Sequence, residues 1–413
     1  MADLSDLPRE RAGWVGRSVV LVADQGLNSA TNIVALVLVA RVASLQQFGV
    51  FATTYLGVLL GQSVAMAALC DRWLQADSAQ RVSRFATGLT IYCVAAAVLV
   101  GFAALLFPFV GINAAIIGAA AVPAIAGLDY VRTVLFAVDR PWAALAMDAA
   151  YGGLQLLGIA IWTGWSGSHG GSGAWLAWAV AAYLVFGVFA CGAVRVQPFV
   201  ERGVREPIRE AVGLRYGAEM LVVNGSWHVA LLIMSTRLGV AFNGLLRATS
   251  IPFGPLVVLA QASRSFLIPL FRAREKDAGR RLLAGACVAY SILCGACTVL
   301  TYVITQSPRL RGIIGGIHPA PGFVLLTGLL FLTNGLHLVV FFYFRARRWD
   351  GPVLTSRVVL VAALIVTTAA SVLFGSSSTF LILASGNWVV AAITMLAGRV
   401  VEVRRGDKRE QRR

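Results

Sequence analysis

Long apolar runs separated by short polar segments follow one another along most of this chain. A helix needs about 20 apolar residues to cross the hydrocarbon core of a bilayer. Runs of about that length lie at 17–43, 48–69, 86–107, 110–137, 142–163 and 174–196, and then at 216–236, 240–263, 282–305, 321–344, 354–374 and 378–400. The pattern predicts an all-α polytopic membrane protein of about twelve transmembrane helices.

The longest polar connection between these runs lies near the middle of the chain, at residues 197–215. We expect it to be a cytoplasmic linker between two six-helix bundles, one over 17–196 and one over 216–400. Two bundles around a central cavity are a common transporter design. The ends would form a cytoplasmic N-terminus, 1–16, and a basic cytoplasmic tail, 401–413.

The composition excludes a water-soluble globular protein. Hydrophobic residues make up 58% of the chain and charged residues only 13%, whereas soluble domains carry about 25% charged residues. The mean hydropathy is +0.77. Residues 1–13 are polar and lack the basic region and cleavage site of a secretory signal, so we expect the first apolar helix to be retained.

The charge distribution predicts the orientation of the chain in the membrane. There are 35 basic and 19 acidic residues, a formal net charge of +16. A cytoplasmic N-terminus places most basic residues on the inner side, as the positive-inside rule requires. We therefore expect a protein of the plasma (inner) membrane with both termini in the cytoplasm. Its basic loops would face membrane lipids, and nucleic acid is not an expected partner.

The six cysteines give no sign of a metal site or a disulfide framework. They lie in or at the ends of apolar runs; Cys294 and Cys297 have CxxC spacing, but inside an apolar run, and no cysteine has a spacing that pairs it with histidine. We expect no metal site and no cofactor. The cysteines are Cys70, Cys93, Cys191, Cys287, Cys294 and Cys297.

A polar stripe interrupts the first predicted helix. Asp24, Asn28 and Asn32 are spaced by four residues and share one face, and Gln25 lies beside them. An ionisable group within a span is a candidate functional residue because lipid does not solvate it. The alternative is structural: Asp24 pairs with a basic neighbour, and the amides hold helices together.

The first predicted helix of the second half also contains polar residues within an apolar run. Glu219, Asn224 and His228 lie in an apolar frame, and Asn224 and His228 share a face. We expect this face to form a second wall of the substrate cavity. His228 and His337 both lie in apolar helices and are candidate cavity residues. The alternative is that each is a hydrogen-bonded residue of the core.

The next predicted helix should be broken. Pro252 and Pro255 remove backbone donors from its hydrogen-bond ladder, and broken helices commonly line the substrate path of transporters. Arg247 precedes them and is a candidate cavity residue. The alternative for Arg247 is a snorkelling side chain at the outer interface.

Two further pairs of polar residues lie within apolar runs. Asn334 and His337 in run 321–344 are candidate cavity residues. Asp129 and Arg132, three residues apart, are expected to neutralise each other.

The opening of the chain resembles the polysaccharide exporters of the multidrug/oligosaccharidyl-lipid/polysaccharide (MOP) superfamily, in particular Wzx-type O-antigen flippases. These proteins typically have an Asp-Gln pair and small polar residues in helix 1, an Ala-Arg end, a Phe-Gly turn into helix 2, and twelve to fourteen helices in two bundles. The matching residues here are Asp24-Gln25, Asn28, Ser29, Asn32, Ala40-Arg41 and Gln47-Phe48-Gly49-Val50-Phe51-Ala52.

The resemblance implies that the chain flips or exports a polyprenyl-diphosphate-linked oligosaccharide, with glycan assembly enzymes as further candidate partners. Arg132 and Arg247, with the amides and histidines, would suit a diphosphate and sugar hydroxyls, because arginine offers paired donors to phosphate. Asp24 and Glu219 are the candidates for coupling transport to an ion.

Other functions remain open on the sequence alone. The alternative within transport is a MATE-like or major-facilitator small-molecule antiporter. A cation exporter should concentrate acids in its cavity, and the spans contain few of them. We do not expect an enzyme acting on the same lipid-linked sugars, because glycosyl transfer needs a base or metal near the acceptor and the predicted outer loops are short.

Overall fold

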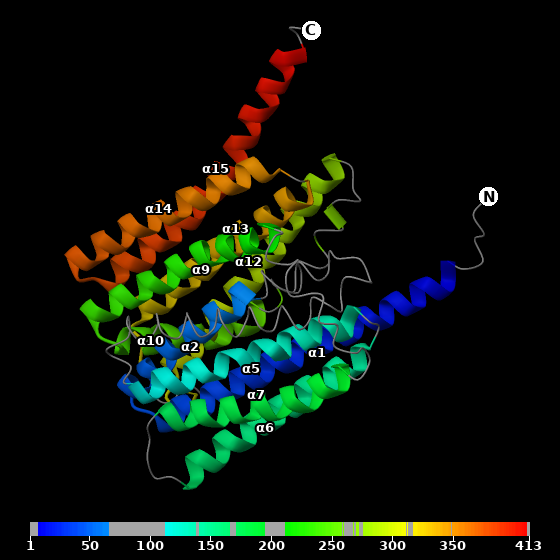
Figure 1. The fold of residues 1–413 in the computed structure, drawn as a ribbon. Helices are drawn as coiled ribbons and strands as arrows, with labels where there is room; N and C mark the ends of the chain where they lie inside the picture. Colours follow the sequence, from blue (N-terminus) through cyan, green and yellow to red (C-terminus); the bar gives the residue numbers. More distant parts are fainter. Residues whose placement is uncertain are drawn as a thin grey trace. The chain divides into compact units, whose positions relative to one another are not determined.

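The computed structural model describes residues 7–65, 112–137, 140–165, 171–194, 211–257, 276–310, 317–347 and 349–410, with a few isolated residues between 259 and 312. These residues form helices, and no strand occurs among them (Figure 1). The chain divides into two compact units, Met1–Asn224 and Gly225–Arg413.

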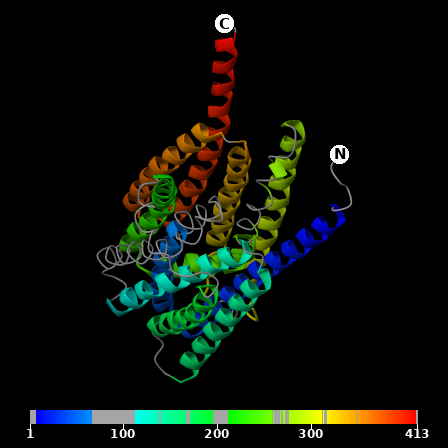
Figure 2. The ribbon, with the colours of Figure 1, turned by 45° about the vertical axis from the view of Figure 1, so that its right-hand side comes forward.

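The first unit is a bundle of long helices. They are α1 (Leu7–Val42), α2 (Leu45–Ala65), α5 (Ile112–Ala137), α6 (Pro141–Trp165) and α7 (Gly171–Val194). Within it α1 packs along α6, α5 along α7, and α2 along α5 (Figures 1 and 2). A Cβ at Gly152 of α6 would collide with the methyl group of Thr31 in α1, so the missing side chain lets these two helices approach closely.

The second unit contains the helices from the middle of the chain to its end. Helix α9 (Ala211–Leu238) runs across the boundary between the units. It is followed by α10 (Ala241–Ser250), a 3₁₀ turn η3 (Ile251–Phe253), α12 (Lys276–Gln306), α13 (Pro321–Ala346), α14 (Asp350–Phe374) and α15 (Ser377–Glu410). The largest contacts of this unit join α15 to α14 and α13, and α12 to α13.

The helices are long and apolar enough to explain the hydrophobic pattern. Ten of the predicted spans coincide with a described helix, and run 86–107 lies outside the described residues. Seven described helices meet the length and hydropathy expected of a membrane span, while the apolar stretches of α1 and α2 are shorter. The structure thus confirms an all-α membrane protein.

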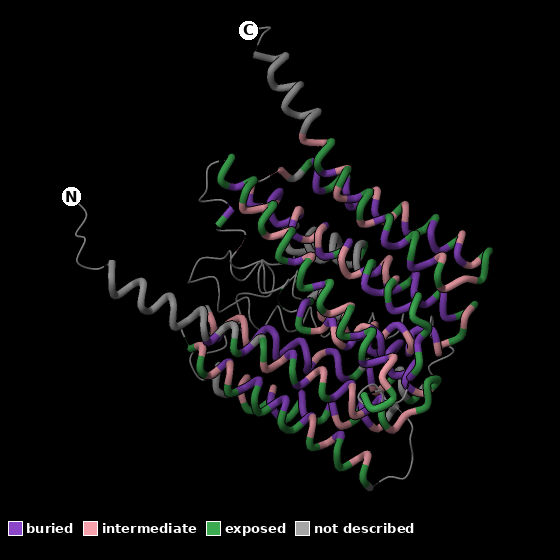
Figure 3. The backbone as a smooth tube through the Cα atoms, turned by 180° about the vertical axis from the view of Figure 1, so that it is seen from behind, coloured by how far each residue is buried: buried purple, intermediate pink, exposed green. Residues whose placement is uncertain are grey.

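Apolar side chains cover much of the outer face of these helices. Val188, Leu373 and Phe374 are 70%, 82% and 75% exposed. Figure 3 shows such exposed positions recurring along the helices between buried ones. Monomeric soluble proteins rarely expose contiguous apolar surface on this scale, whereas lipid tails solvate it without cost.

The predicted helix 240–263 is interrupted at its first proline. Helix α10 ends at Ser250, and the 3₁₀ turn that follows contains Pro252. The backbone N–H of Ile251 bonds to the carbonyl of Ala248, the tighter spacing of a 3₁₀ helix. The structure therefore confirms that the proline interrupts the α-helical ladder.

Candidate functional site

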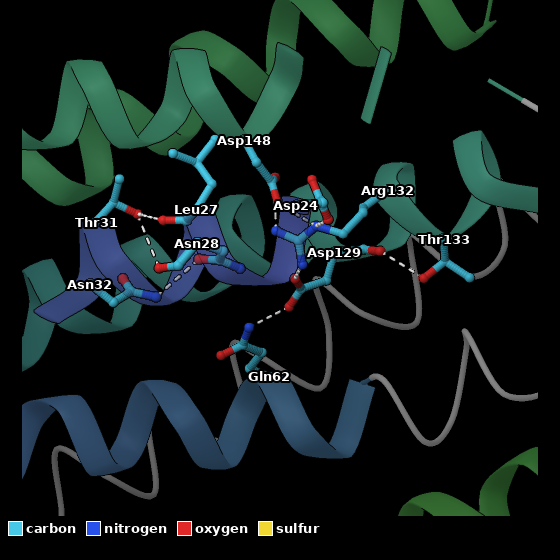
Figure 4. Close-up of polar contacts among 10 residues, drawn as sticks. All are labelled: Asp24, Leu27, Asn28, Thr31, Asn32, Gln62, Asp129, Arg132, Thr133 and Asp148. Atoms are coloured by element: carbon cyan, nitrogen blue, oxygen red, sulfur yellow. Dashed lines mark hydrogen bonds and ion pairs between the residues drawn. The ribbon is translucent and has the colours of Figure 1, made fainter. Parts of the chain in front are cut away.

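A cluster of buried charged residues lies inside the first unit, between α1, α5 and α6. Asp24 of α1 is fully buried, and Asp129 of α5 and Asp148 of α6 are only 4% and 2% exposed. All three surround Arg132 of α5, whose side chain is 12% exposed (Figure 4). We call these four residues the acidic cluster.

Arg132 binds one carboxylate through two parallel contacts. Its Nε lies 2.7 Å from Oδ2 of Asp148, and its Nη2 donates to Oδ1 of the same residue at 2.8 Å. This paired arrangement uses the planar fork of the guanidinium and is the strongest geometry for an arginine and a carboxylate. Helix α5 is therefore tied to α6 at this point.

Asp129 and Asp24 complete the surroundings of Arg132. Nη1 of Arg132 donates to Oδ1 of Asp129, and Nε2 of Gln62 in α2 donates to its other oxygen. Asp24 is held more loosely, with Oδ2 3.6 Å from Nε of Arg132. Of the three carboxylates, Asp24 thus has the weakest contact with the positive charge.

The acidic cluster contains more acid than base. Three carboxylates face one guanidinium, and a negative charge without a counter-charge is costly in a medium of low dielectric constant. A proton or a cation would offset the surplus. Among the described residues, however, no group of three His, Cys, Asp or Glu side chains could hold a metal ion. The surplus of negative charge makes the acidic cluster a candidate for proton exchange.

The structure changes two expectations for Arg132. It does contact Asp129, as predicted, but that pair is not self-contained because Asp148 makes the paired contact. The expected role in binding a diphosphate is not supported, since carboxylates already occupy Nε and both terminal nitrogens.

The amides of the α1 stripe bond to each other. Nδ2 of Asn32 donates to Oδ1 of Asn28 at 3.0 Å, and both residues are half-buried (Figure 4). Thr31, on the side facing α6, donates to the carbonyls of Leu27 and Asn28. The stripe is thus partly satisfied within its own helix.

Three predicted site residues have side chains outside the described part of the structure. Gln25 lies in α1, and Glu219 and Asn224 lie in α9, and their helical backbone is all that is described. Their roles remain predictions.

The other predicted site residues belong to the second unit. His228 in α9 is buried, and Arg247 in α10 is half-buried. His337 in α13 is 1% exposed and packs against Trp388 with ring centroids 5.1 Å apart, whereas Asn334 is exposed. Asn334 and His337 therefore differ in their surroundings although they lie on the same helix.

Two residues of this site, Asp148 and Gln62, were not predicted from the sequence. Asp148 lies in the apolar run 142–163, so the criterion that singled out Asp24, an ionisable group within a span, also applies to it. Gln62 carries no such signal, because a neutral amide in an apolar helix is commonly a contact between helices.

Comparison with known proteins supports the fold. Three solved structures match the chain over nearly its whole length: an outward-facing multidrug resistance MATE family transporter of the MOP superfamily, a MOP superfamily transporter from Pyrococcus furiosus, and the lipid II flippase MurJ in an inward closed conformation. The TM-scores are 0.60, 0.56 and 0.59 at 16%, 16% and 11% identity. The matches cover 94%, 94% and 92% of this chain and 95%, 95% and 87% of the other chains.

The chain has the fold of MOP superfamily transporters. No protein-family model and no curated protein matches it in sequence. The comparison is thus one of architecture: membrane transporters with different cargoes share this fold, and the cargo is not read from it.

Proposed function

We propose that the protein is a proton-coupled transporter that flips a polyprenyl-diphosphate-linked oligosaccharide across the plasma membrane by alternating access. The observation that carries the proposal is the acidic cluster, buried within one unit of a transporter fold. A surplus of buried carboxylates has no evident value for stability, and intramembrane ionisable groups commonly serve ion coupling.

Asp24 is the residue best placed to exchange the proton. It is the carboxylate farthest from Arg132, at 3.6 Å, whereas Asp148 and Asp129 are held by direct hydrogen bonds. Protonation of Asp24 would remove one of the surplus negative charges and weaken the electrostatic attraction between Asp24 and Arg132. Because Arg132 joins α1, α5 and α6, such a change would alter the contacts among three helices.

The proposed cargo rests on the sequence and on the breadth of the fold. The opening segment, Asp24 to Ala52, resembles flippases of lipid-linked sugars. The likeness to the lipid II flippase over 92% of the chain is compatible with a cargo of that chemical class.

The test is to deplete the protein and quantify polyprenyl-diphosphate-linked oligosaccharide on each membrane leaflet. We expect inner-leaflet accumulation that the wild-type gene corrects and the Asp24→Asn variant does not. Asp277→Asn is the matched control, since this carboxylate is 88% exposed and lies outside the acidic cluster. Unchanged lipid-linked sugar on both leaflets would exclude the proposed cargo.

A second candidate is a MATE-like antiporter of organic cations. The acidic cluster favours it, because three buried carboxylates around one arginine are the concentration of acid that a cation exporter needs. Proton-driven efflux of a fluorescent organic cation from cells or proteoliposomes tests it. Efflux that Asp24→Asn abolishes, together with unchanged lipid-linked sugar, would favour the antiporter over the flippase.

A further inference from the structure

A row of polar side chains runs along one buried face of α6, beginning in the acidic cluster. Asp148, Tyr151 and Gln155 are spaced by three and four residues, so they lie on the same side of the helix. Their exposed fractions are 2%, 6% and 0%. Asp148 belongs to the acidic cluster, whereas the proposed proton exchange leaves Tyr151 and Gln155 without a role.

The face that carries these residues packs against α7. The indole nitrogen of Trp178 in α7 donates to the hydroxyl of Tyr151. One turn beyond Gln155, a Cβ added at Gly158 would lie 3.0 Å from the Cβ of Ala177 in α7. Gln155 comes between these two contacts in the same helical row, so its buried side chain lies where α6 meets α7.

The amide of Gln155 is buried without a hydrogen-bond partner among the residues that the structure describes. This holds for both of its polar atoms, Nε2 and Oε1. A buried amide without partners costs free energy, because folding has removed its hydrogen bonds to water. Native proteins rarely leave such a group unsatisfied, so a partner for this amide is expected.

Tyr151 has unused hydrogen-bonding capacity one turn away from this amide. Its oxygen accepts the bond from Trp178, but within the described part of the chain its own hydrogen has no acceptor. The Cβ atoms of residues four apart on a helix are about 5–6 Å apart. One water between the two side chains would accept from the hydroxyl of Tyr151 and donate to Oε1 of Gln155.

The burial and the neutrality of the two side chains indicate what their partner is. A fully buried amide does not meet a bulky cargo, so the partner is small. A cation fits poorly, because neither Tyr151 nor Gln155 brings a negative charge. An internal water needs two to four polar partners, and the hydroxyl and the amide provide them.

We propose that Tyr151 and Gln155 bind an internal water that passes protons to and from the acidic cluster. Tyr151 lies one turn from Asp148, the carboxylate that Arg132 binds through two contacts. The water accepts a proton on one side and releases a different proton on the other, so every O–H bond that breaks is replaced. The water site does not depend on the proposed function, whereas its role in proton exchange rests on it.

The water site is tested by hydroxyl-radical footprinting of the full-length protein in detergent, with mass spectrometry of the oxidised peptides. X-rays generate radicals from internal water as well as from bulk water, so a buried residue beside a bound water is oxidised. We expect oxidation of Tyr151 although it is only 6% exposed. Tyr290 is the control and should react far more slowly, because it is 8% exposed and its hydroxyl already donates to the carbonyl of Phe331.

Gln155→Leu removes the amide while keeping a side chain of similar size. We expect the oxidation of Tyr151 to fall about fivefold in this variant, with no change at Tyr290. Thermal unfolding shows whether the variant folds. A dry site predicts unchanged oxidation and a large gain in stability, because the substitution then removes an unsatisfied buried amide. That pattern, or an unmodified Tyr151 in the wild-type protein, would overturn the proposal.

The role in proton exchange is tested by the leaflet measurement in depleted cells. We expect Gln155→Leu and Tyr151→Phe to correct the inner-leaflet accumulation only in part. Leu157→Ala is the control on the same helix and should correct it fully, since Leu157 is 56% exposed. Full correction by Gln155→Leu would exclude the water from the proton route. If the wild-type gene changes neither leaflet, the proposed cargo is wrong, and footprinting still decides whether the water is bound.

Discussion

At the scale of residues, the charge balance around Arg132 governs the acidic cluster. Among the described residues, this guanidinium is the base that Asp24, Asp129 and Asp148 contact. Removing one member of a buried ion pair costs far more than the pair contributes, because a buried charge is left uncompensated. Arg132 thus has a structural role that its three acidic partners do not share equally.

We expect Arg132→Gln to lower the free energy of unfolding by about 3–5 kcal/mol, since it removes the guanidinium that all three buried carboxylates contact. Adding Asp148→Asn should recover part of that loss by removing one of the like charges. Thermal unfolding of the purified protein in detergent measures both effects. Arg280→Gln serves as the control and should change stability by less than about 0.5 kcal/mol. A double variant less stable than Arg132→Gln would contradict this charge balance.

At the scale of elements, two kinds of contact hold the helices together. Glycines allow close approach, as at Gly335 of α13, where an added Cβ would collide with the ring of Tyr290 in α12. Aromatic rings fill wider gaps: Phe51 of α2 stacks on Trp175 of α7 with centroids 5.0 Å apart. Both contacts join neighbouring helices within one unit.

Gly335→Ala should destabilise the second unit by about 1–3 kcal/mol, because the new methyl group must displace Tyr290, whose hydroxyl donates to the carbonyl of Phe331 at 3.2 Å. Gly295 of α12 has open space around it, so Gly295→Ala should instead stabilise by up to about 1 kcal/mol through its higher helix propensity. Unfolding temperatures of the two variants provide the comparison. If both substitutions raised the unfolding temperature, the side chain of Tyr290 would have moved aside without cost, which would contradict the tight packing at Gly335.

Phe51→Ala should cost about 3–5 kcal/mol, since Phe51 is fully buried and contacts both Trp175 and Trp178. Phe374, which is 75% exposed, provides the control, and Phe374→Ala should have little effect. Denaturant titration followed by tryptophan fluorescence measures both losses, and Trp175 and Trp178 are two of the ten tryptophans that contribute to the signal. An equal loss in the two variants would contradict a packed α2–α7 contact.

At the scale of the whole molecule, a chain that crosses a membrane repeatedly should place successive connections on alternate sides of it. The connection from α1 to α2 contains Ser44, and the connection from α5 to α6 contains Arg140, and both residues are exposed. With a cytoplasmic N-terminus, Ser44 would lie outside and Arg140 inside.

In a cysteine-free background, Ser44→Cys should react with a membrane-impermeant maleimide in intact cells, and Arg140→Cys only after the membrane is opened. The physical basis is the positive-inside distribution of the basic residues. Labelled fractions on gels measure the reaction. The reverse pattern would invert the proposed orientation.

The sequence was sufficient for the helices and for part of the site. The length and hydropathy of a run are local properties, so ten predicted spans coincide with described helices, and Pro252 marked the break after α10. Asp24 could be singled out because an ionisable group is conspicuous in an apolar run. The partners of Asp24 could not, since Asp129, Arg132 and Asp148 are more than 100 residues away along the chain.

Hydropathy and charge along the chain thus determined by themselves that this is an all-α membrane protein, because burial in lipid acts on each segment separately. Only the tertiary structure decided that three carboxylates meet one arginine, and that His337 is buried while Asn334 on the same helix is exposed. These outcomes depend on which helix faces pack together. Side-chain contacts between helices determine that packing, and no single segment contains the information.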